Sequence, residues 1–215
     1  MSQTAALLRQ GIADLELPLP LSVNERLLDY LRLLAKWNRV YNLTAIREET
    51  EWVSHHLLDS LAVVPHLPPG RIVDVGSGAG LPGIPIAFAC PDRQVTLLDS
   101  NQKKGAFLTQ ASTELALANV DILIGRAESY RPATAYDVVI SRAFSSMGDF
   151  IRLAGHLLEP GGVMAAMKGA LLDAEIAQLP GSWTVETIVP LHVPQLKAKR
   201  HLVLLRRAPR AKSPE

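Results

Sequence analysis

Three glycines at alternate positions directly follow a short apolar segment of this chain. Residues 71–75 read Arg-Ile-Val-Asp-Val, and Gly76, Gly78 and Gly80 follow at alternate positions. Glycine lets the backbone turn sharply and approach a ligand with no side chain in the way. Pro82 then suits the first turn of a helix, where a missing N–H costs nothing. The segment therefore predicts a strand, a tight loop and a helix, with a ligand site at the carboxyl end of the strand.

From residue 71 onward, short apolar runs alternate with segments of helical spacing. The expected strands are residues 71–75, 94–98, 120–124, 136–140, 162–167, 183–191 and 199–206. The expected helices are residues 81–89, 102–118, 149–158 and 171–179, and Phe107, Ala111, Leu115 and Ala118 line one side of the second. This alternation indicates a mostly parallel sheet with helices on both faces. Because no helix separates the last two strands, we expect them to pair antiparallel at one edge.

A helical segment precedes this α/β region. Leu27, Leu31 and Leu34 recur at helical spacing, and Ser22 is the expected N-cap. A second helical run covers residues 55–64 and stops before the Pro-Pro-Gly sequence at 68–70, which favours a boundary there. We predict an N-terminal helical appendage (residues 1–69) packed on an α/β core (residues 70–208), followed by a frayed tail (residues 209–215).

Composition limits the class of protein further. The chain has 215 residues, 48% of them hydrophobic, which is enough for a sizeable core. Its 22 Lys and Arg against 21 Asp and Glu exclude a polybasic protein, so any nucleic acid must be bound by local basic patches. One cysteine, Cys90, allows no internal disulfide. Without a signal peptide or an apolar run of ~18 residues, we expect a cytoplasmic protein that does not contact a membrane.

The details of the glycine loop limit the class of ligand that it can bind. The loop lacks the Gly-Lys-Ser/Thr ending of a P-loop, and Gly80 comes one residue too early for the dinucleotide fingerprint. Ser77 is off the centre of a nucleophile elbow. The pattern that fits is Asp74 with three alternate glycines after the first strand, and Asp99 at the end of the second, placed to accept both ribose hydroxyls. This combination indicates a Rossmann-like class I sheet that binds S-adenosylmethionine.

Two further strand ends are expected to lie near this cofactor. Ala127 and Glu128 follow the third strand, at the corner that faces the adenine. Residues 141–146 follow the fourth strand, where a methyltransferase faces the methyl group and its acceptor. No Asn-Pro-Pro-Tyr-like segment follows that strand, which disfavours methylation of exocyclic base amines. No Tyr-x-x-x-Lys pair is present either, which disfavours a short-chain dehydrogenase.

Other reactive side chains have structural interpretations. His55 and Asp59 stand four residues apart, as two metal ligands on a helix would, but no third or fourth ligand is near them in the sequence. We therefore expect a polar cluster at a helix end and no metal site. Cys90 precedes a proline where a helix closes, and we interpret it as a buried thiol.

Several blocks of the chain match one family in the right order. The matching blocks are residues 36–44, 56–60, 74–85, 97–100, 141–144, 168–169 and 200–203. The most specific are the Gly-Leu-Pro-Gly-Ile-Pro extension of the loop and the Ser-Arg-Ala sequence that begins at Ser141. From about Leu27 to Leu205 the chain resembles the RsmG (GidB) family. This family comprises the bacterial methyltransferases that modify N7 of guanine 527 in the 530 loop of 16S ribosomal RNA.

The resemblance implies methyl transfer from S-adenosylmethionine, with S-adenosylhomocysteine as the product. It assigns cofactor binding to Gly76, Leu81, Ala127, Glu128 and Arg142. The glycine spacing and the strand end add Gly78 and Asp99. Because guanine N7 carries a free lone pair, we expect no general base and name no catalytic residue. Catalysis is expected to rest on aligning sulfur, methyl group and N7.

Affinity for RNA is expected to come from phosphate contacts. The candidates are Arg32, Lys36 and Arg39 on one helix face, and Lys103, Lys104, Lys168, Lys197, Lys199 and Arg200 elsewhere. We expect 16S rRNA or the small ribosomal subunit as partner, and a monomeric protein. Two alternatives stay open: a small-molecule methyltransferase on the same fold, and a nucleotide-binding regulator that senses its ligand without turnover.

Overall fold

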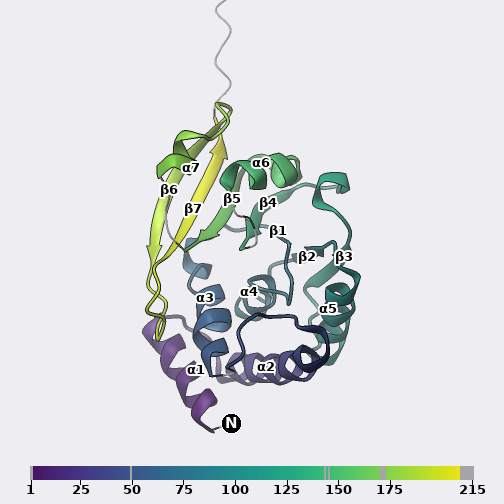
Figure 1. Ribbon diagram of the computed structural model, residues 1–215, viewed down its shortest axis with the longest axis vertical. Helices are drawn as coiled ribbons and strands as arrows, with labels where there is room; N and C mark the ends of the chain where they lie inside the picture. The colour runs from purple at the N-terminus through teal and green to yellow at the C-terminus, as the bar shows by residue number, and fades with distance from the viewer. Residues whose placement is uncertain (1, 49, 143, 145, 170–172, 209–215) are drawn as a thin grey trace, which may run out of the picture.

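Seven strands form one sheet in the described part of the chain. The computed structural model describes residues 2–48, 50–142, 144, 146–169 and 173–208 (Figure 1). In space the strands run in the order β3-β2-β1-β4-β5-β7-β6. They are β1 (Ile72–Val75), β2 (Val95–Asp99), β3 (Val120–Ile124), β4 (Tyr136–Ser141), β5 (Leu158–Lys168), β6 (Trp183–Leu191) and β7 (Arg200–Arg207). The chain direction across the sheet reverses between β1 and β4, the kind of point where open α/β sheets bind ligands.

The first five strands are parallel, and the last two are antiparallel, as the sequence predicts. β1 pairs in parallel with β2 and β4, β2 with β3, and β4 with β5. β7 lies antiparallel between β5 and β6, with Val203 opposite both Ala166 and Ile188. β5 begins at Leu158 rather than at residue 162, because its pairing with β4 shifts register there and the added residues bulge outward.

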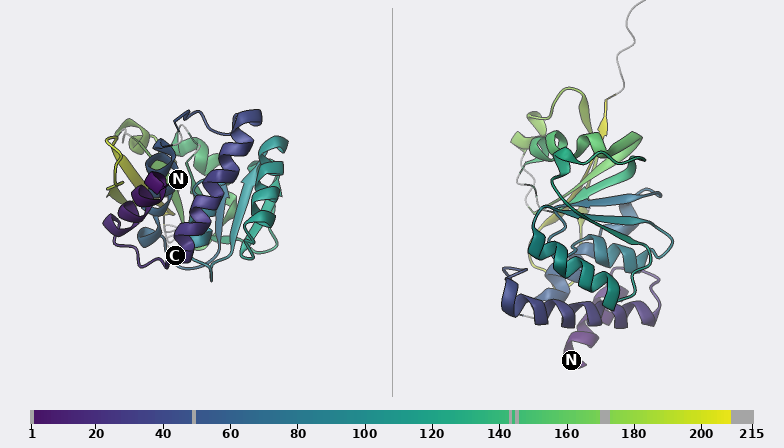
Figure 2. Two further views of the ribbon diagram at one scale, coloured as in Figure 1. Left: turned by 90° about the horizontal axis from the view of Figure 1, so that it is seen from below. Right: turned by 90° about the vertical axis from the view of Figure 1, so that its right-hand side faces the viewer.

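Helices cover both faces of the sheet (Figure 2). Successive strand residues belong to two different hydrophobic cores. Ile72 and Leu97 point into the first core, whereas their neighbours Val73 and Leu98 point into the second. The first core is covered by α2 (Leu21–Tyr41), α4 (Gly83–Ala89) and α5 (Gln102–Glu114), and the second by α6 (Met147–Ala154). Strands buried on both faces explain why the sequence shows continuous apolar runs rather than alternation.

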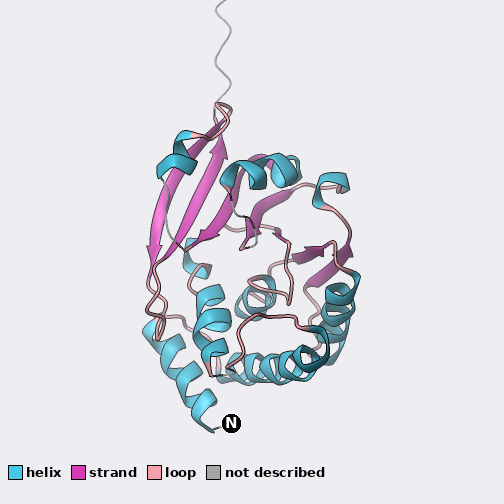
Figure 3. Cartoon of the chain, in the orientation of Figure 1, coloured by secondary structure: helices cyan, strands magenta, loops and turns pink. Residues whose placement is uncertain are grey.

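The N-terminal segment is helical and contributes to the first core. It consists of α1 (Ser2–Asp14), α2, a π-helical turn η1 (Val53–Leu58), α3 (Asp59–Leu61) and a 3-10 turn η2 (Val64–His66). In Figure 3, α2 runs beneath the sheet, and α1 lies at the lower left of the molecule. Leu27 and Leu57 share one core with strand residues. The hydroxyl of Tyr30 donates to the carbonyl of Ala79 at 2.7 Å, which ties α2 to the glycine loop.

The starts of the N-terminal helices differ from the prediction. α2 begins at Leu21, and Pro20 occupies the cap position with an extended backbone, so Ser22 lies inside the helix. The fixed φ of proline allows that extended conformation just before a helix. α1 was not predicted, because it contributes little to a periodic pattern: Leu8 and Ile12 are its main buried apolar residues. The segment expected over residues 55–64 begins earlier, at Val53, as a π-helical turn.

Two helices of the α/β region end sooner than expected. α5 stops at Glu114 rather than at residue 118, because the chain turns at Ala116, whose φ is +46°. Leu117 is consequently buried in place of Ala118, which is exposed. At the end of α4, Cys90 is only partly buried because it lies outside the helix, at the C-cap position, where the proline that follows disfavours a helical backbone.

The segment after β5 contains one short helix, α7 (Asp173–Ala177). It is shorter than the helix predicted for residues 171–179, whose first two residues lie outside the described part of the chain, as does the predicted tail at 209–215. α6 begins before residue 149 and gives way to a 3-10 turn, η4 (Gly155–Leu157), after Ala154. Among the described residues, no helix has the length and apolar character needed to cross a membrane.

Candidate active site

The loop between β1 and α4 is left-handed at three glycines. Gly76, Gly78 and Gly80 have φ angles of +73°, +61° and +84°, a region in which residues with a Cβ are strained. A Cβ on Gly80 would lie 2.4 Å from Cδ1 of Ile84, so packing also requires glycine there. A Cβ on Gly78 would have no described neighbour nearer than 3.9 Å. Gly78 therefore borders open space, as a residue in a ligand cradle must.

Asp74 fastens this loop from inside the protein. Its fully buried side chain accepts a 2.8 Å hydrogen bond at Oδ2 from the backbone N–H of Gly83, at the start of α4. Burial raises the pKa of Asp74 to about 7, although the bond from Gly83 and the charge of Arg142 act in the opposite direction. Because a ligand cannot reach this enclosed carboxyl group, its role is to hold strand and helix together across the loop.

Asp99 ends β2 beside the loop, and both of its oxygens accept backbone hydrogen bonds. Oδ2 accepts from the N–H of Gly78 at 2.8 Å, and Oδ1 accepts from the N–H of Asn101 at 2.8 Å. The ammonium group of Lys104 lies 3.9 Å from Oδ2. A carboxylate oxygen has two lone pairs, so each keeps one acceptor position for a ligand. The carboxylate is thus fixed in orientation, and its contact with ribose hydroxyls stays a prediction.

Two adjoining cavities flank the loop. One, of about 180 Å³, lies between the loop, the end of β2 and the 3-10 turn η3 (Ala127–Ser129). The other, of about 200 Å³, lies between the loop and the segment after α2. Gly76 lines both cavities. The seven residues predicted to bind the cofactor all line one or both of them: Gly76, Gly78, Leu81, Asp99, Ala127, Glu128 and Arg142.

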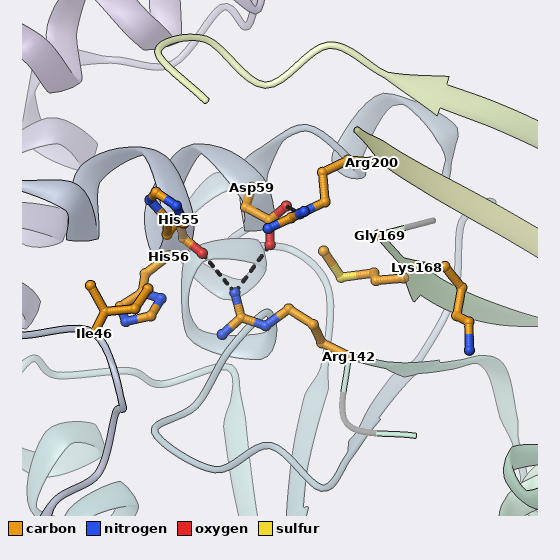
Figure 4. A pocket seen from close by; sticks show the side chains of 9 residues that line it. Ile46, His55, His56, Asp59, Arg142, Lys168, Gly169 and Arg200 are labelled. Atoms are coloured by element: carbon orange, nitrogen blue, oxygen red, sulfur yellow. Dashed lines mark hydrogen bonds and ion pairs between the residues drawn. The ribbon is translucent and has the colours of Figure 1, made fainter. Parts of the chain in front are cut away.

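A third cavity, of about 350 Å³, adjoins the second and shares His56 and Arg142 with it. Residues from five parts of the chain surround this cavity (Figure 4): the loop after α2, the helical segment η1–α3, the end of β4, the end of β5 and the start of β7. The other residues of its wall are Ile46, His55, Asp59, Met167, Lys168, Gly169 and Arg200. The three cavities therefore form a row past the glycine loop.

Asp59 bridges two arginines in the wall of the third cavity (Figure 4). Its Oδ2 lies 3.1 Å from Nη1 of Arg142, and its Oδ1 lies 2.9 Å from Nε of Arg200. Only 2% of the Asp59 side chain is exposed, and a buried charge is tolerated when it is paired and hydrogen-bonded. The sequence analysis placed Asp59 in a family-like block and considered a chemical role for it only with His55, four residues earlier. It missed this role because the arginines lie 83 and 141 residues away in the chain.

His56 lies between the second and third cavities in its neutral form. Its Nε2 is 2.9 Å from Oγ1 of Thr44. Burial, and after it the charge of Arg142, lowers the pKa of His56 to about 4. In the sequence, His56 belongs to the family-like block of residues 56–60 but was given no role. Within the ranges that the structure describes, no three His, Cys, Asp or Glu side chains are grouped to hold a metal ion.

The basic residues predicted to contact RNA fall into two groups. Exposed side chains belong to Arg32, Lys36, Arg39, Lys103, Lys197 and Lys199. By contrast, Arg200 is held at the third cavity by Asp59, and Lys168 lies 3.0 Å from Glu175 with 11% of its side chain exposed. Lys104 is partly buried near Asp99. The exposed group is open to contact with phosphates, whereas Lys168 and Arg200 form part of a cavity wall.

Comparisons with known sequences agree with the predicted family. The family described as rRNA small subunit methyltransferase G (GidB) matches residues 23–203. The ribosomal RNA small subunit methyltransferase G of Ralstonia nicotianae is 54% identical over 214 residues, covering 95% of this chain and 96% of that protein. The protein of the same name from Nitrosospira multiformis is 52% identical over 211 residues, covering 95% and 98%.

Solved structures share the fold at low sequence identity. A SAM-dependent methyltransferase from Thiobacillus denitrificans, solved with S-adenosyl-L-homocysteine, is 14% identical, with a TM-score of 0.51 over 82% of this chain and 98% of that one. A predicted O-methyltransferase from Agrobacterium tumefaciens is 24% identical, with a TM-score of 0.59 over 73% and 83%. These likenesses confirm the predicted class I methyltransferase fold. Sequence and fold together show that the chain belongs to the rRNA small subunit methyltransferase G family.

Proposed function

We propose that this protein transfers the methyl group of S-adenosylmethionine to N7 of guanine 527, in the 530 loop of 16S ribosomal RNA, and releases S-adenosylhomocysteine. Family membership supports the reaction. The observation in the structure that carries it is the row of cavities: the residues predicted for the cofactor surround two of them, and a third, lined by two arginines, adjoins them. Transfer between a cofactor and a second ligand requires such a pair of neighbouring sites.

The residues of the first two cavities fit this cofactor. The open space at Gly78 leaves room for a ligand against the loop backbone. The buried hydroxyl of Ser77, in the wall of the second cavity, has no hydrogen-bond partner within the described residues. Asp99 would hold the ribose hydroxyls, and Ala127 and Glu128 the adenine. When bound, S-adenosylmethionine supplies an electrophilic methyl group.

For this reaction the protein has mainly to align the sulfur, the methyl group and guanine N7. The lone pair of guanine N7 carries no proton, so no side chain has to remove one before the attack. His56 agrees with this, because a pKa of about 4 makes it a poor proton acceptor at neutral pH. Holding the reacting atoms in line contributes up to roughly 7–11 kcal/mol to such a reaction. The arginines at the third cavity are then positioning and binding groups.

The substrate is an RNA far larger than the cavities, so contacts outside them must contribute to affinity. Two groups of exposed cations are suited to contacts with phosphates. Those of α2 are Arg32, Lys36 and Arg39, and those before β7 are Lys197 and Lys199. In this proposal the protein is a monomer that acts in the cytoplasm on 16S rRNA or the small ribosomal subunit. Residues 1–69 form a helical appendage on the α/β core of residues 70–208.

Mass spectrometry of 16S rRNA fragments from cells with and without the gene tests this function. We expect deletion to remove one methyl group from a guanine of the 530 loop, and the wild-type gene to restore it. A Gly78→Val variant should fail to restore it. An unchanged 530 loop in the deletion strain would refute the substrate. Methylation of metabolites alone by the purified protein would favour the small-molecule enzyme, and cofactor binding without any turnover would favour the regulator.

A further inference from the structure

We propose that Asp59 is a positioning residue for this reaction. It holds Arg142 and Arg200 in one arrangement on the wall of the third cavity, and thereby links the cofactor side of the site to the side that receives the RNA. This inference rests on the proposed function, because it names a residue that orders the same site.

The three side chains come from separate parts of the fold. Asp59 begins α3 in the N-terminal segment, Arg142 directly follows β4, and Arg200 begins β7. Figure 4 shows the carboxylate of Asp59 between the two guanidinium groups, with a dashed line from Arg142 also reaching the backbone at His55. That bond, from Nη1 of Arg142 to the carbonyl oxygen of His55, is 2.9 Å long. The helical segment thus fixes Arg142 through two acceptors.

Charge makes Asp59 necessary for this arrangement. Two guanidinium groups that face the same cavity repel each other, and both lose solvation where they are partly buried, with 28% and 24% of their side chains exposed. A single carboxylate with one oxygen on each arginine offsets both effects. Without its charge, the arginines are free to separate and to adopt other rotamers.

The pairing also orients the remaining donors. Arg142 uses Nη1 for both of its bonds to the helical segment, and Arg200 uses Nε for Asp59 and Nη1 for the carbonyl of Lys199. Within the described residues, Nη2 of each arginine has no hydrogen-bond partner. Because a guanidinium group is planar, fixing one or two of its N–H groups fixes the direction of the others. The cavity therefore presents oriented donors to oxygen atoms of the RNA.

The two arginines differ in which cavities they line, and this makes the proposal testable. Arg142 lines both the second and the third cavity, whereas Arg200 lines only the third. Loss of Asp59 should therefore weaken the cofactor side through Arg142 and the RNA side through both arginines. A change at Arg200 alone should affect only the RNA side.

The test compares Asp59→Asn, Arg200→Lys and the double variant. S-adenosylhomocysteine affinity is measured by calorimetry, and kcat and KM are measured for small ribosomal subunits from a strain that lacks the gene. We expect Asp59→Asn to weaken S-adenosylhomocysteine binding and to raise KM, each by about tenfold or more. Arg200→Lys should raise KM and leave S-adenosylhomocysteine affinity within about twofold. Because Asp59 acts on the RNA through Arg200, the double variant should have a KM no higher than that of the worse single variant.

Glu186→Gln is the matched control. Glu186 forms a 2.7 Å ion pair with Nε of Arg206, and neither residue lines any of the three cavities. It should change neither readout. The proposal is overturned if Asp59→Asn keeps wild-type S-adenosylhomocysteine affinity and KM, or if the two single effects multiply in the double variant. Should Asp59→Asn show no melting transition, Arg200→Lys decides alone, and an unchanged KM overturns the proposal. If the wild-type protein does not methylate small ribosomal subunits, the proposed function is refuted. The S-adenosylhomocysteine affinity of Asp59→Asn would still report whether Asp59 orders Arg142.

Discussion

Replacing Gly78 with alanine should separate cofactor binding from folding, because the two depend on different properties of this residue. The backbone is left-handed there, with φ of +61°, and an L-residue in that region costs about 1–2 kcal/mol. The added Cβ meets no described atom nearer than 3.9 Å, so packing adds no further cost. For a chain of this size we expect the melting temperature to fall by roughly 2–8 °C.

The same methyl group would stand in the cavity beside the loop, where the cofactor is proposed to lie against the backbone. A ligand that must move away from the loop loses its contacts with the backbone of residues 76–79. We therefore expect the affinity for S-adenosylhomocysteine to fall at least tenfold, which corresponds to about 1.4 kcal/mol. Calorimetric titration measures the affinity, and differential scanning calorimetry measures the stability of the same samples.

Gly161→Ala is a matched control for backbone strain. Gly161 has φ of +85° and open space at its Cβ position, but it lies in the bulge of β5 and lines none of the three cavities. It should lose similar stability and bind S-adenosylhomocysteine normally. Wild-type affinity in Gly78→Ala would refute the proposed position of the cofactor. Equal loss of affinity in both variants would trace the effect to strain rather than to the cavity.

Three further predictions follow from the same geometry. Asp99→Ala should cost ~1–3 kcal/mol of S-adenosylhomocysteine affinity in calorimetry, and unchanged binding would mean that the ribose lies elsewhere. Changing Arg32, Lys36 and Arg39 together to glutamine should flatten the slope of log RNA affinity against log salt concentration by about two to three units, with unchanged S-adenosylhomocysteine affinity. A wild-type slope would mean that these three cations do not contact the RNA. Asp74 has a folded-state pKa of about 7, above its unfolded value, so the stability it contributes is complete below that unfolded value and is lost as pH rises through 7. Asp74→Asn should therefore gain stability relative to wild type between pH 5 and 8 in denaturant titrations, and a difference that does not vary with pH would contradict this.

The glycine loop and the order of the elements could be predicted from the sequence because both depend on local chemistry. Alternate glycines after an apolar run require a tight turn, and the structure has left-handed φ angles at Gly76, Gly78 and Gly80. The seven strands appear where apolar runs predicted them, with shifts at their ends. Most errors concern boundaries, as at Ser22 and Ala118, because a single turn residue or cap moves a helix end without changing the periodic pattern. The exceptions are α1, which was not predicted, and Cys90, which is only partly buried.

The residues around the third cavity could not be identified in this way. His55 and Asp59 read as a weak metal pair, since only their helical spacing is visible in the sequence. The partners of Asp59 come from the end of β4 and the start of β7, 83 and 141 residues further along the chain. Lys168 and Arg200 likewise read as surface cations, although ion pairs hold both at the cavity wall.

Local sequence patterns were sufficient to predict the family, the class I methyltransferase sheet and seven residues that line the first two cavities, because these features depend on short segments in which neighbours along the chain act together. The arrangement of η1 and α3 beside the ends of β4 and β5 and the start of β7 became visible only in the folded chain, as did the buried carboxylate that joins two arginines there. The physical reason is that the pairing of buried charges depends on which distant segments share an enclosed space. That is fixed by the packing of the two cores and by the antiparallel entry of β7 into the sheet, not by any local preference of the residues involved.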